Sequence, residues 1–305
     1  MTTSTALRSS VRAAFGSLID YAGLFPPAEL PPAHALREYQ TAREGPYAWM
    51  LGRFIVPAPL LAELAAVASG PFSVIVDPNV DALEVVANAR TRGVKVEALE
   101  IPLARAVSPN RESLSRDEIL DVIGALEADI SVQGLRALPA FVEVPRSVPW
   151  QSMLGDTLAA IARFELKAKI RCGGVTADAF PTVAELAGFI GAADAANLPF
   201  KATAGLHHPV RRRDAGTGFT THGFLNVMAA AALASRVDPE TLHAIVAEEE
   251  PSAFWFGDDS FSWRDHSVSL DELLRTRADA FAGFGSCSFS EPVDDLTALG
   301  ILPAR

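Results

Sequence analysis

The sequence has no long apolar run, few cysteines and fewer basic than acidic residues. No stretch of about 18 apolar residues occurs, so we expect no membrane-spanning segment. The N-terminal residues lack the apolar core of a signal peptide. Cys172 and Cys287 are the only cysteines, which argues against a disulfide framework and a structural zinc site. With 26 basic and 37 acidic residues the net charge is −11, which argues against binding to nucleic acid or a membrane surface. We therefore expect a cytoplasmic protein.

Strand-like and helix-like segments alternate along the 305 residues. Short runs of β-branched and aromatic residues are separated by stretches rich in alanine and leucine. Eight such alternations are typical of the α/β class and of a parallel (β/α)8 TIM-type barrel, so we expect one domain over residues 1–305. The expected strands are 17–23, 51–56, 72–77, 94–101, 138–144, 167–172, 200–205 and 284–289. The expected helices are 30–43, 59–68, 81–92, 115–128, 152–164, 182–195 and 223–236.

Residues 253–268, AFWFGDDSFSWRDHSV, interrupt this alternation. Two strand-like arms flank a turn at Asp258 and Asp259, which predicts a β-hairpin inserted before the last barrel strand. The alternative makes this segment a barrel strand and removes the strand at 17–23.

Charged residues recur on the predicted inner face of the barrel. In a barrel strand alternate side chains point inward, and the apolar set must face the helices. In KAKIRC, for example, Ala168 and Ile170 face outward, so Lys169 and Arg171 point into the barrel. The same argument turns these residues inward at or near the carboxyl ends of their strands: Asp77, Glu100, Glu143, Lys201, Thr203 and His207. A barrel active site lies at that end, although a purely structural network of salt bridges would give the same pattern.

Three of these strands resemble those of deoxyribose-phosphate aldolases and related class I aldolase barrels. The matching residues are Lys169 by strand order, the run Lys201-Ala202-Thr203-Ala204-Gly205, and the run Gly285-Ser286-Cys287-Ser288. The resemblance implies that Lys169 forms a Schiff base, that Lys201 lowers the pKa of its amine, and that Glu100 helps to move protons. It also implies that the turn 285–288 holds phosphate. The sixth strand reads KIRCGG rather than KTSTG, and glutamate stands where aspartate is usual.

A second resemblance covers more of the chain. The segments KIRCGG, FKATAGLHHP, HGFLN and FGSCSFSEP together resemble an uncharacterised bacterial family of TIM-barrel proteins. This resemblance implies the fold and no particular chemistry.

The residues themselves are compatible with Schiff-base catalysis. A lysine must be neutral to attack a carbonyl, so its pKa of about 10.4 must fall to about 7–8. Lys169 and Lys201 are expected on adjacent strands about 5 Å apart, where each ammonium lowers the pKa of the other. Glu100 or Glu143 would transfer the proton. A carboxylate between the two lysines would reverse the effect.

We therefore expect a lyase or isomerase that acts on a small carbonyl compound. Whether this compound carries a phosphate group is left open. The loop 207–222 contains the run Arg211-Arg212-Arg213 and would cover the pocket and attract an anionic substrate. Asp20, at the start of the segment DYAGLFPP, could reach the same pocket. The alternative is that this segment is only a rigid loop covering one mouth of the barrel. The expected catalytic residues are Lys169, Lys201, Glu100 and Glu143. The expected substrate-binding residues are Arg171, Thr203, His207, Arg211, Ser286 and Ser288.

Two other functions remain open at this point. Asp77, Glu100 and Glu143 could hold Mg²⁺, which would stabilise an enolate while a lysine acts as base. Alternatively, the barrel binds a small ligand without catalysis. The sequence contains no GxGxxG, GxxxxGK[ST] or HxH motif, which argues against a nucleotide-binding loop and a histidine-based zinc hydrolase. The oligomeric state is left open, a homo-oligomer included.

Overall fold

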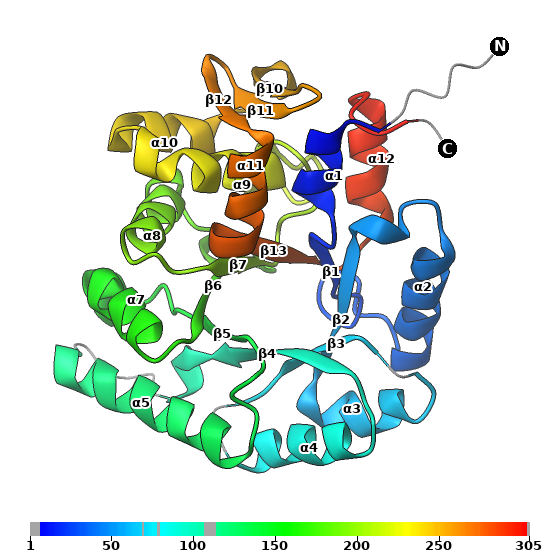
Figure 1. The fold of residues 1–305 in the computed structure, drawn as a ribbon, viewed down its shortest axis with the longest axis vertical. Helices are drawn as coiled ribbons and strands as arrows, with labels where there is room; N and C mark the ends of the chain where they lie inside the picture. The colour runs from blue at the N-terminus through cyan, green and yellow to red at the C-terminus, as the bar shows by residue number, and fades with distance from the viewer. Residues whose placement is uncertain (1–6, 69, 78–79, 107–113, 304–305) are drawn as a thin grey trace.

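Eight parallel strands close into a barrel in the computed structural model, which describes residues 7–68, 70–77, 80–106 and 114–303. Around the barrel the strands follow the order β1, β13, β7, β6, β5, β4, β3, β2, and helices surround them (Figure 1). The fold is therefore the α/β TIM-type barrel predicted from the alternation of segments. The barrel strands are β1 (Ile19–Tyr21), β2 (Leu51–Pro57), β3 (Phe72–Ile75), β4 (Val96–Pro102), β5 (Ala140–Glu143), β6 (Lys167–Arg171), β7 (Phe200–Thr203) and β13 (Phe281–Ser286).

Local sequence signals explain where several helices begin. Ser115 and Glu118 form a capping box at the start of α5, and Thr182 and Glu185 form another at the start of α8. Each pair supplies partners for backbone N–H groups that the first helical turn leaves free. The α-helices are α1 (Ser9–Phe15), α2 (Pro32–Glu44), α3 (Ala58–Ala65), α4 (Val80–Thr91), α5 (Arg116–Val132), α6 (Val148–Ser152), α7 (Leu154–Arg163), α8 (Val183–Ala195), α9 (Phe224–Leu233), α10 (Pro239–Ala247), α11 (Leu270–Arg275) and α12 (Ser290–Ala298).

The inserted segment has three strands rather than the two expected. β10 (Phe254–Phe256) pairs with β11 (Ser260–Trp263), which pairs in turn with β12 (His266–Ser269), all antiparallel. A second turn follows Trp263, because Arg264 adopts a positive φ of 48° and the chain reverses there. Ser10 of α1 donates its backbone N–H to the carbonyl of Asp258 at 3.1 Å, so this sheet lies against the start of the chain. A two-residue pair, β8 (Arg212–Arg213) with β9 (Thr220–Thr221), lies in the loop after β7.

The last barrel strand lies three residues earlier than expected, at 281–286 instead of 284–289. Ser288 therefore lies beyond the strand, where its hydroxyl accepts a hydrogen bond from the backbone N–H of Glu291 at the start of α12. The run of small residues in this segment gives no clear signal for where the strand begins.

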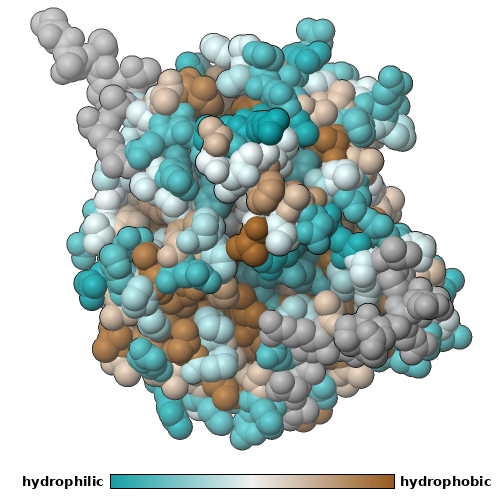
Figure 2. All heavy atoms as spheres, turned by 180° about the vertical axis from the view of Figure 1, so that it is seen from behind, coloured by the Kyte–Doolittle hydropathy of each residue, from teal (hydrophilic) through white to brown (hydrophobic). Residues whose placement is uncertain are grey.

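Apolar side chains between the strands and the outer helices form the core, which includes Phe54, Phe72, Phe200 and Phe284. The opposite face of the molecule carries hydrophilic residues interspersed with smaller apolar groups (Figure 2). In the described part of the chain, no helix has both the length and the apolar character needed to cross a membrane.

Candidate active site

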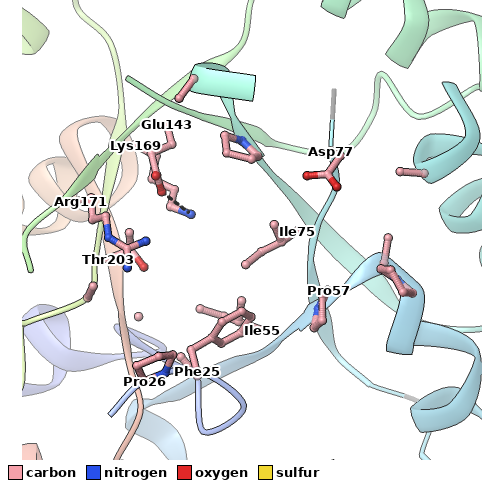
Figure 3. A pocket seen from close by; sticks show the side chains of 18 of the residues that line it. Phe25, Pro26, Ile55, Pro57, Ile75, Asp77, Glu143, Lys169, Arg171 and Thr203 are labelled. Atoms are coloured by element: carbon pink, nitrogen blue, oxygen red, sulfur yellow. Dashed lines mark ion pairs between the residues drawn. The ribbon is translucent and has the colours of Figure 1, made fainter. Parts of the chain in front are cut away.

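A cavity of about 920 Å³ opens at the carboxyl ends of the barrel strands. Its lining includes Glu143, Arg171 and Thr203, which are the last residues of β5, β6 and β7, together with Lys169 (Figure 3). This is the end of the barrel at which TIM-barrel active sites lie, and the volume lies in the range of small-molecule sites. Phe25 and Pro26, from the loop after β1, add an apolar wall.

Lys169 lies at the boundary between the cavity and the barrel interior. Its Nζ is 2.7 Å from Glu100 Oε2 and 3.1 Å from Glu143 Oε2. The Lys169 side chain is 5% exposed, whereas Glu143 is 19% exposed and lines the cavity with it. The sequence contains only four lysines among its 26 basic residues, and of the described residues lining this cavity Lys169 is the one lysine.

Lys201 lies deeper in the interior. Its Nζ is 2.5 Å from Glu100 Oε1 and 2.5 Å from Asp20 Oδ2. Ser73 donates its hydroxyl to Glu100 Oε1 at 2.7 Å, and Asp20 Oδ1 accepts the backbone N–H of Arg53 at 2.6 Å. The structure therefore brings together the four residues expected to be catalytic. It adds Asp20, expected only at the pocket, and Ser73, which no sequence signal indicated.

The carboxylates determine the protonation state of Lys169. Burial alone would lower its pKa, but the charges and hydrogen bonds of Glu100 and Glu143 outweigh burial and raise it. Burial likewise would raise the pKa of Glu100, but attraction to Lys169 and Lys201 outweighs it and lowers that pKa. The expected lowering of the Lys169 pKa by a neighbouring ammonium is therefore wrong, because Glu100 lies between the two lysines.

Two cationic groups of the cavity are available to an anion. Arg171 lines it, and its Nε donates to the carbonyl of Gly173 at 3.0 Å; within the described residues it has no carboxylate partner. His207 also lines it, with Nδ1 3.0 Å from Glu291 Oε2 and Nε2 3.7 Å from Cys287 Sγ. Burial would lower the pKa of His207, but its contacts with Cys287 and Glu291 raise it to about 9. At neutral pH His207 is therefore cationic.

Close backbone contact at the ends of β6 and β7 shapes this side of the cavity. Gly205 adopts a φ of +69°, a backbone conformation that residues other than glycine rarely adopt. A Cβ atom there would also lie 2.7 Å from the carbonyl oxygen of Cys172, and one at Gly173 would lie 2.8 Å from Gly205 Cα. The glycines of the KIRCGG and FKATAG segments thus allow the two strand ends that carry Arg171 and Thr203 to approach each other.

Three of the expected substrate-binding residues do not line the cavity. Ser286 is buried and donates its hydroxyl to the carbonyl of Ser288, while the Ser288 hydroxyl accepts the backbone N–H of Glu291. On the inner face Gly285 and Cys287 line the cavity instead. Arg211 forms an ion pair with Glu249, and of the loop 207–222 only His207 is among the described lining residues. Gly285 and Cys287 are two residues apart, and alternation of side chains along an extended chain puts such residues on one face.

The three carboxylates considered for Mg²⁺ do not converge. Asp77 lies beyond the end of β3, is exposed, and is across the cavity from Lys169 and Glu143 (Figure 3). Glu100 is fully buried beneath the lysines. Over residues 7–303, apart from the segments left undescribed, no three His, Cys, Asp or Glu side chains lie close enough together to hold a metal ion.

No protein-family model matches the sequence, and no curated protein matches it. The resemblance to aldolases therefore stays a prediction.

Proposed function

We propose that the protein is a lyase or isomerase for a small anionic carbonyl compound and that Lys169 forms a Schiff base with this substrate. The observation that carries the proposal is the position of Lys169. Among the described residues it is the one lysine of the cavity, and it contacts a carboxylate, Glu143, that lines the same cavity. A nucleophile within reach of a proton acceptor is the arrangement that covalent catalysis by lysine requires.

The raised pKa of Lys169 means that the resting amine is protonated and must lose a proton to react. Glu143 is the suitable acceptor, because Glu100 is held by both lysines and by Ser73 and its pKa is lowered. The neutral amine then attacks the carbonyl carbon, a C–N bond forms, and the carbonyl electron pair moves onto the oxygen. Glu143 returns the proton to that oxygen and then transfers a second proton from the nitrogen to the hydroxyl, which leaves as water. The resulting iminium accepts electrons from the bond that breaks at the neighbouring carbon.

The charges in the cavity favour an anionic substrate. Arg171 and the cationic His207 both line the cavity that Lys169 reaches. A carboxylate or phosphate group of the substrate would bind these cations, and its carbonyl would then lie within reach of Lys169.

A second chemistry is favoured by the same raised pKa. A protonated Lys169 can donate a hydrogen bond to a carbonyl oxygen and stabilise an enolate without becoming covalently attached. Glu143 would then remove the proton from the neighbouring carbon. This chemistry also gives a lyase or isomerase, and it needs no neutral lysine.

Borohydride trapping distinguishes the two chemistries. The protein is incubated with a panel of small anionic aldehydes and ketones, reduced, digested and examined by mass spectrometry. Because the chain has only four lysines, an adduct is readily assigned. We expect an adduct on Lys169, lost in Lys169→Arg, and slower formation in Glu143→Gln. Turnover without any adduct would establish the non-covalent chemistry instead. Binding of the panel without turnover or adduct would leave a ligand-binding barrel.

A further inference from the structure

A second cavity, of about 560 Å³, lies at the amino ends of the barrel strands. Its lining includes Lys167, the first residue of β6, and Lys95, which directly precedes β4. None of the described residues that line it also lines the carboxyl-end cavity. The Lys–carboxylate network of the interior lies between the two ends, because Lys167 and Lys169 are two residues apart on one strand.

Basic side chains dominate this cavity. Among the described residues five of them line it, against the single carboxylate of Glu97. They are Arg43, Arg53, Lys95, Lys167 and Arg277. Glu97 is already engaged, with Oε1 2.9 Å from Lys95 Nζ and Oε2 3.3 Å from Arg53 Nε. Asp20, which is not among the lining residues, lies 3.8 Å from Arg53 Nη1. The five cations still outnumber these two carboxylates, and like charges repel one another unless a further anion compensates them.

Three of these cations form no close ion pair within the described residues, although Asp20 attracts Arg277 from further away. Arg43 donates to the hydroxyl of Tyr39, and Lys167 lies over the ring of Phe141, 5.9 Å from its centroid. Arg277 donates to the backbone carbonyls of Phe281 and Gly16. Its Nε is buried without a hydrogen-bond partner. Buried N–H groups of this kind are normally satisfied, and each one left open favours a ligand that can accept from it.

The backbone around Arg277 is unusual as well. Residues Thr276–Ala280 form a π-helical turn between α11 and β13. Such turns are rare in proteins as a whole, and those that occur often lie at functional sites. This one brings Arg277 to the amino-end cavity rather than to the outer surface of the barrel.

From these observations we propose that the amino-end cavity binds a small multivalent anion of the phosphate class. Arginine guanidinium groups match the oxygens of phosphate in a bidentate manner, and lysine adds a compact charge. The cavity volume accommodates more than a single phosphate group, so a diphosphate or an organic phosphate suits it better than a lone ion. The site is independent of the carbonyl chemistry at the other end of the barrel.

Calorimetric titration of the full chain with inorganic pyrophosphate at low ionic strength tests the proposal. We expect saturable binding at one site, weakened about tenfold or more in Lys167→Gln and in Arg43→Gln, because each removes one charge-assisted contact. Both substitutions spare the carbonyl contacts of Arg277 and should leave folding intact, which thermal unfolding checks. Arg163→Gln, at the exposed end of α7, removes the same charge elsewhere and should bind pyrophosphate like the wild type.

Arg171→Gln separates this site from the substrate cavity. We expect it to leave pyrophosphate binding unchanged. If Arg171→Gln abolishes binding while Lys167→Gln does not, the anion sits in the carboxyl-end cavity and the proposal is wrong. Titration without saturation, or equal weakening by Arg163→Gln, would show general screening of charge and would also overturn it. None of these outcomes bears on borohydride trapping at Lys169, so the two proposals can fail separately.

Discussion

Lys169 on β6 and Lys201 on β7 are register partners, and the two oxygens of a single carboxylate bind one ammonium group each. That carboxylate, Glu100, attracts both ammonium groups and so compensates the repulsion between the two buried cations. The lysines are not equivalent, because Lys169 lines the cavity and Lys201 does not. Under the proposed function, this difference makes Lys169 the residue that contacts the substrate and leaves Lys201 to the electrostatic balance of the interior.

Replacing Lys201 should therefore destabilise the fold. In Lys201→Met the carboxylates of Asp20 and Glu100 both lose a partner at 2.5 Å while remaining buried. Breaking a buried ion pair in this way costs about 3–5 kcal/mol of unfolding free energy. Urea denaturation followed by circular dichroism measures the loss. Lys167→Met is the matched control, since Lys167 has no carboxylate partner within the described residues. Equal stability of the two variants would contradict the role given to Lys201.

The network also predicts how stability depends on acid. The pKa of Glu100 is lowered in the folded protein from an ordinary value of 4.5, so the unfolded chain takes up a proton at a higher pH than the folded chain. The stabilisation is therefore fully present above pH 4.5 and is lost as the pH falls below it. Unfolding free energies measured from neutral pH down to about pH 3 should fall more steeply for the wild type than for Glu100→Gln.

Glu100→Gln should also be less stable than the wild type at neutral pH, because it leaves two buried ammonium groups undercompensated. Glu165→Gln, whose side chain is 77% exposed, serves as the control and should retain the steep acid dependence. The same slope for Glu100→Gln and the wild type would contradict the prediction.

Alternation along the strands was sufficient to predict part of this site. In β6 and β7 the apolar residues occupy every second position, and in β5 Val142 and Val144 flank Glu143. The inward direction of Glu143, Lys169 and Lys201 therefore followed from the sequence. The register then brings these three residues side by side. The barrel itself followed from the eightfold alternation of strand-like and helix-like segments.

Contacts that depend on side-chain conformation or on the path of a loop could not be predicted from the sequence. The position of Glu100 between the lysines depends on how long side chains fold within the barrel. The ion pair of Arg211 with Glu249 joins residues 38 positions apart and turns this arginine away from the cavity. The start of β13 was misplaced because Gly283 and Gly285 interrupt the pattern of β-branched and aromatic residues that marks a strand.

The positive charge of His207 predicts that affinity for an anionic substrate falls at alkaline pH. Its pKa is raised from 6.5 to about 9, so its positive charge persists at neutral pH and is lost as the pH rises through about 9. The KM for an anionic substrate should rise over the same interval. The stabilisation that the charged imidazole gives the fold is fully present below pH 6.5 and disappears through about pH 9.

Titration of the histidine Cε1 protons by NMR measures this pKa directly, with His207→Gln identifying the signal. Glu291→Gln removes the carboxylate 3.0 Å from Nδ1 and should lower the pKa of His207. An unshifted pKa in the wild type, or no response to Glu291→Gln, would be incompatible with the contacts described.

The two cysteines should differ sharply in reactivity. Cys287 lines the carboxyl-end cavity with its Sγ 3.7 Å from His207 Nε2. Cys172 is completely buried, and burial raises the pKa of its thiol to about 12. The reactive form of a cysteine is the thiolate, so Cys172 should be inert in the folded protein. Iodoacetamide should therefore alkylate Cys287 alone under native conditions and both cysteines in urea, as measured by mass spectrometry of the digested protein.

The adduct on Cys287 would occupy the substrate cavity, so alkylation should also abolish borohydride trapping at Lys169. Cys287→Ser should keep trapping and resist inactivation. Native alkylation of Cys172 at the same rate would contradict its burial. Full trapping after modification of Cys287 would show that Cys287 does not border the cavity in which Lys169 reacts.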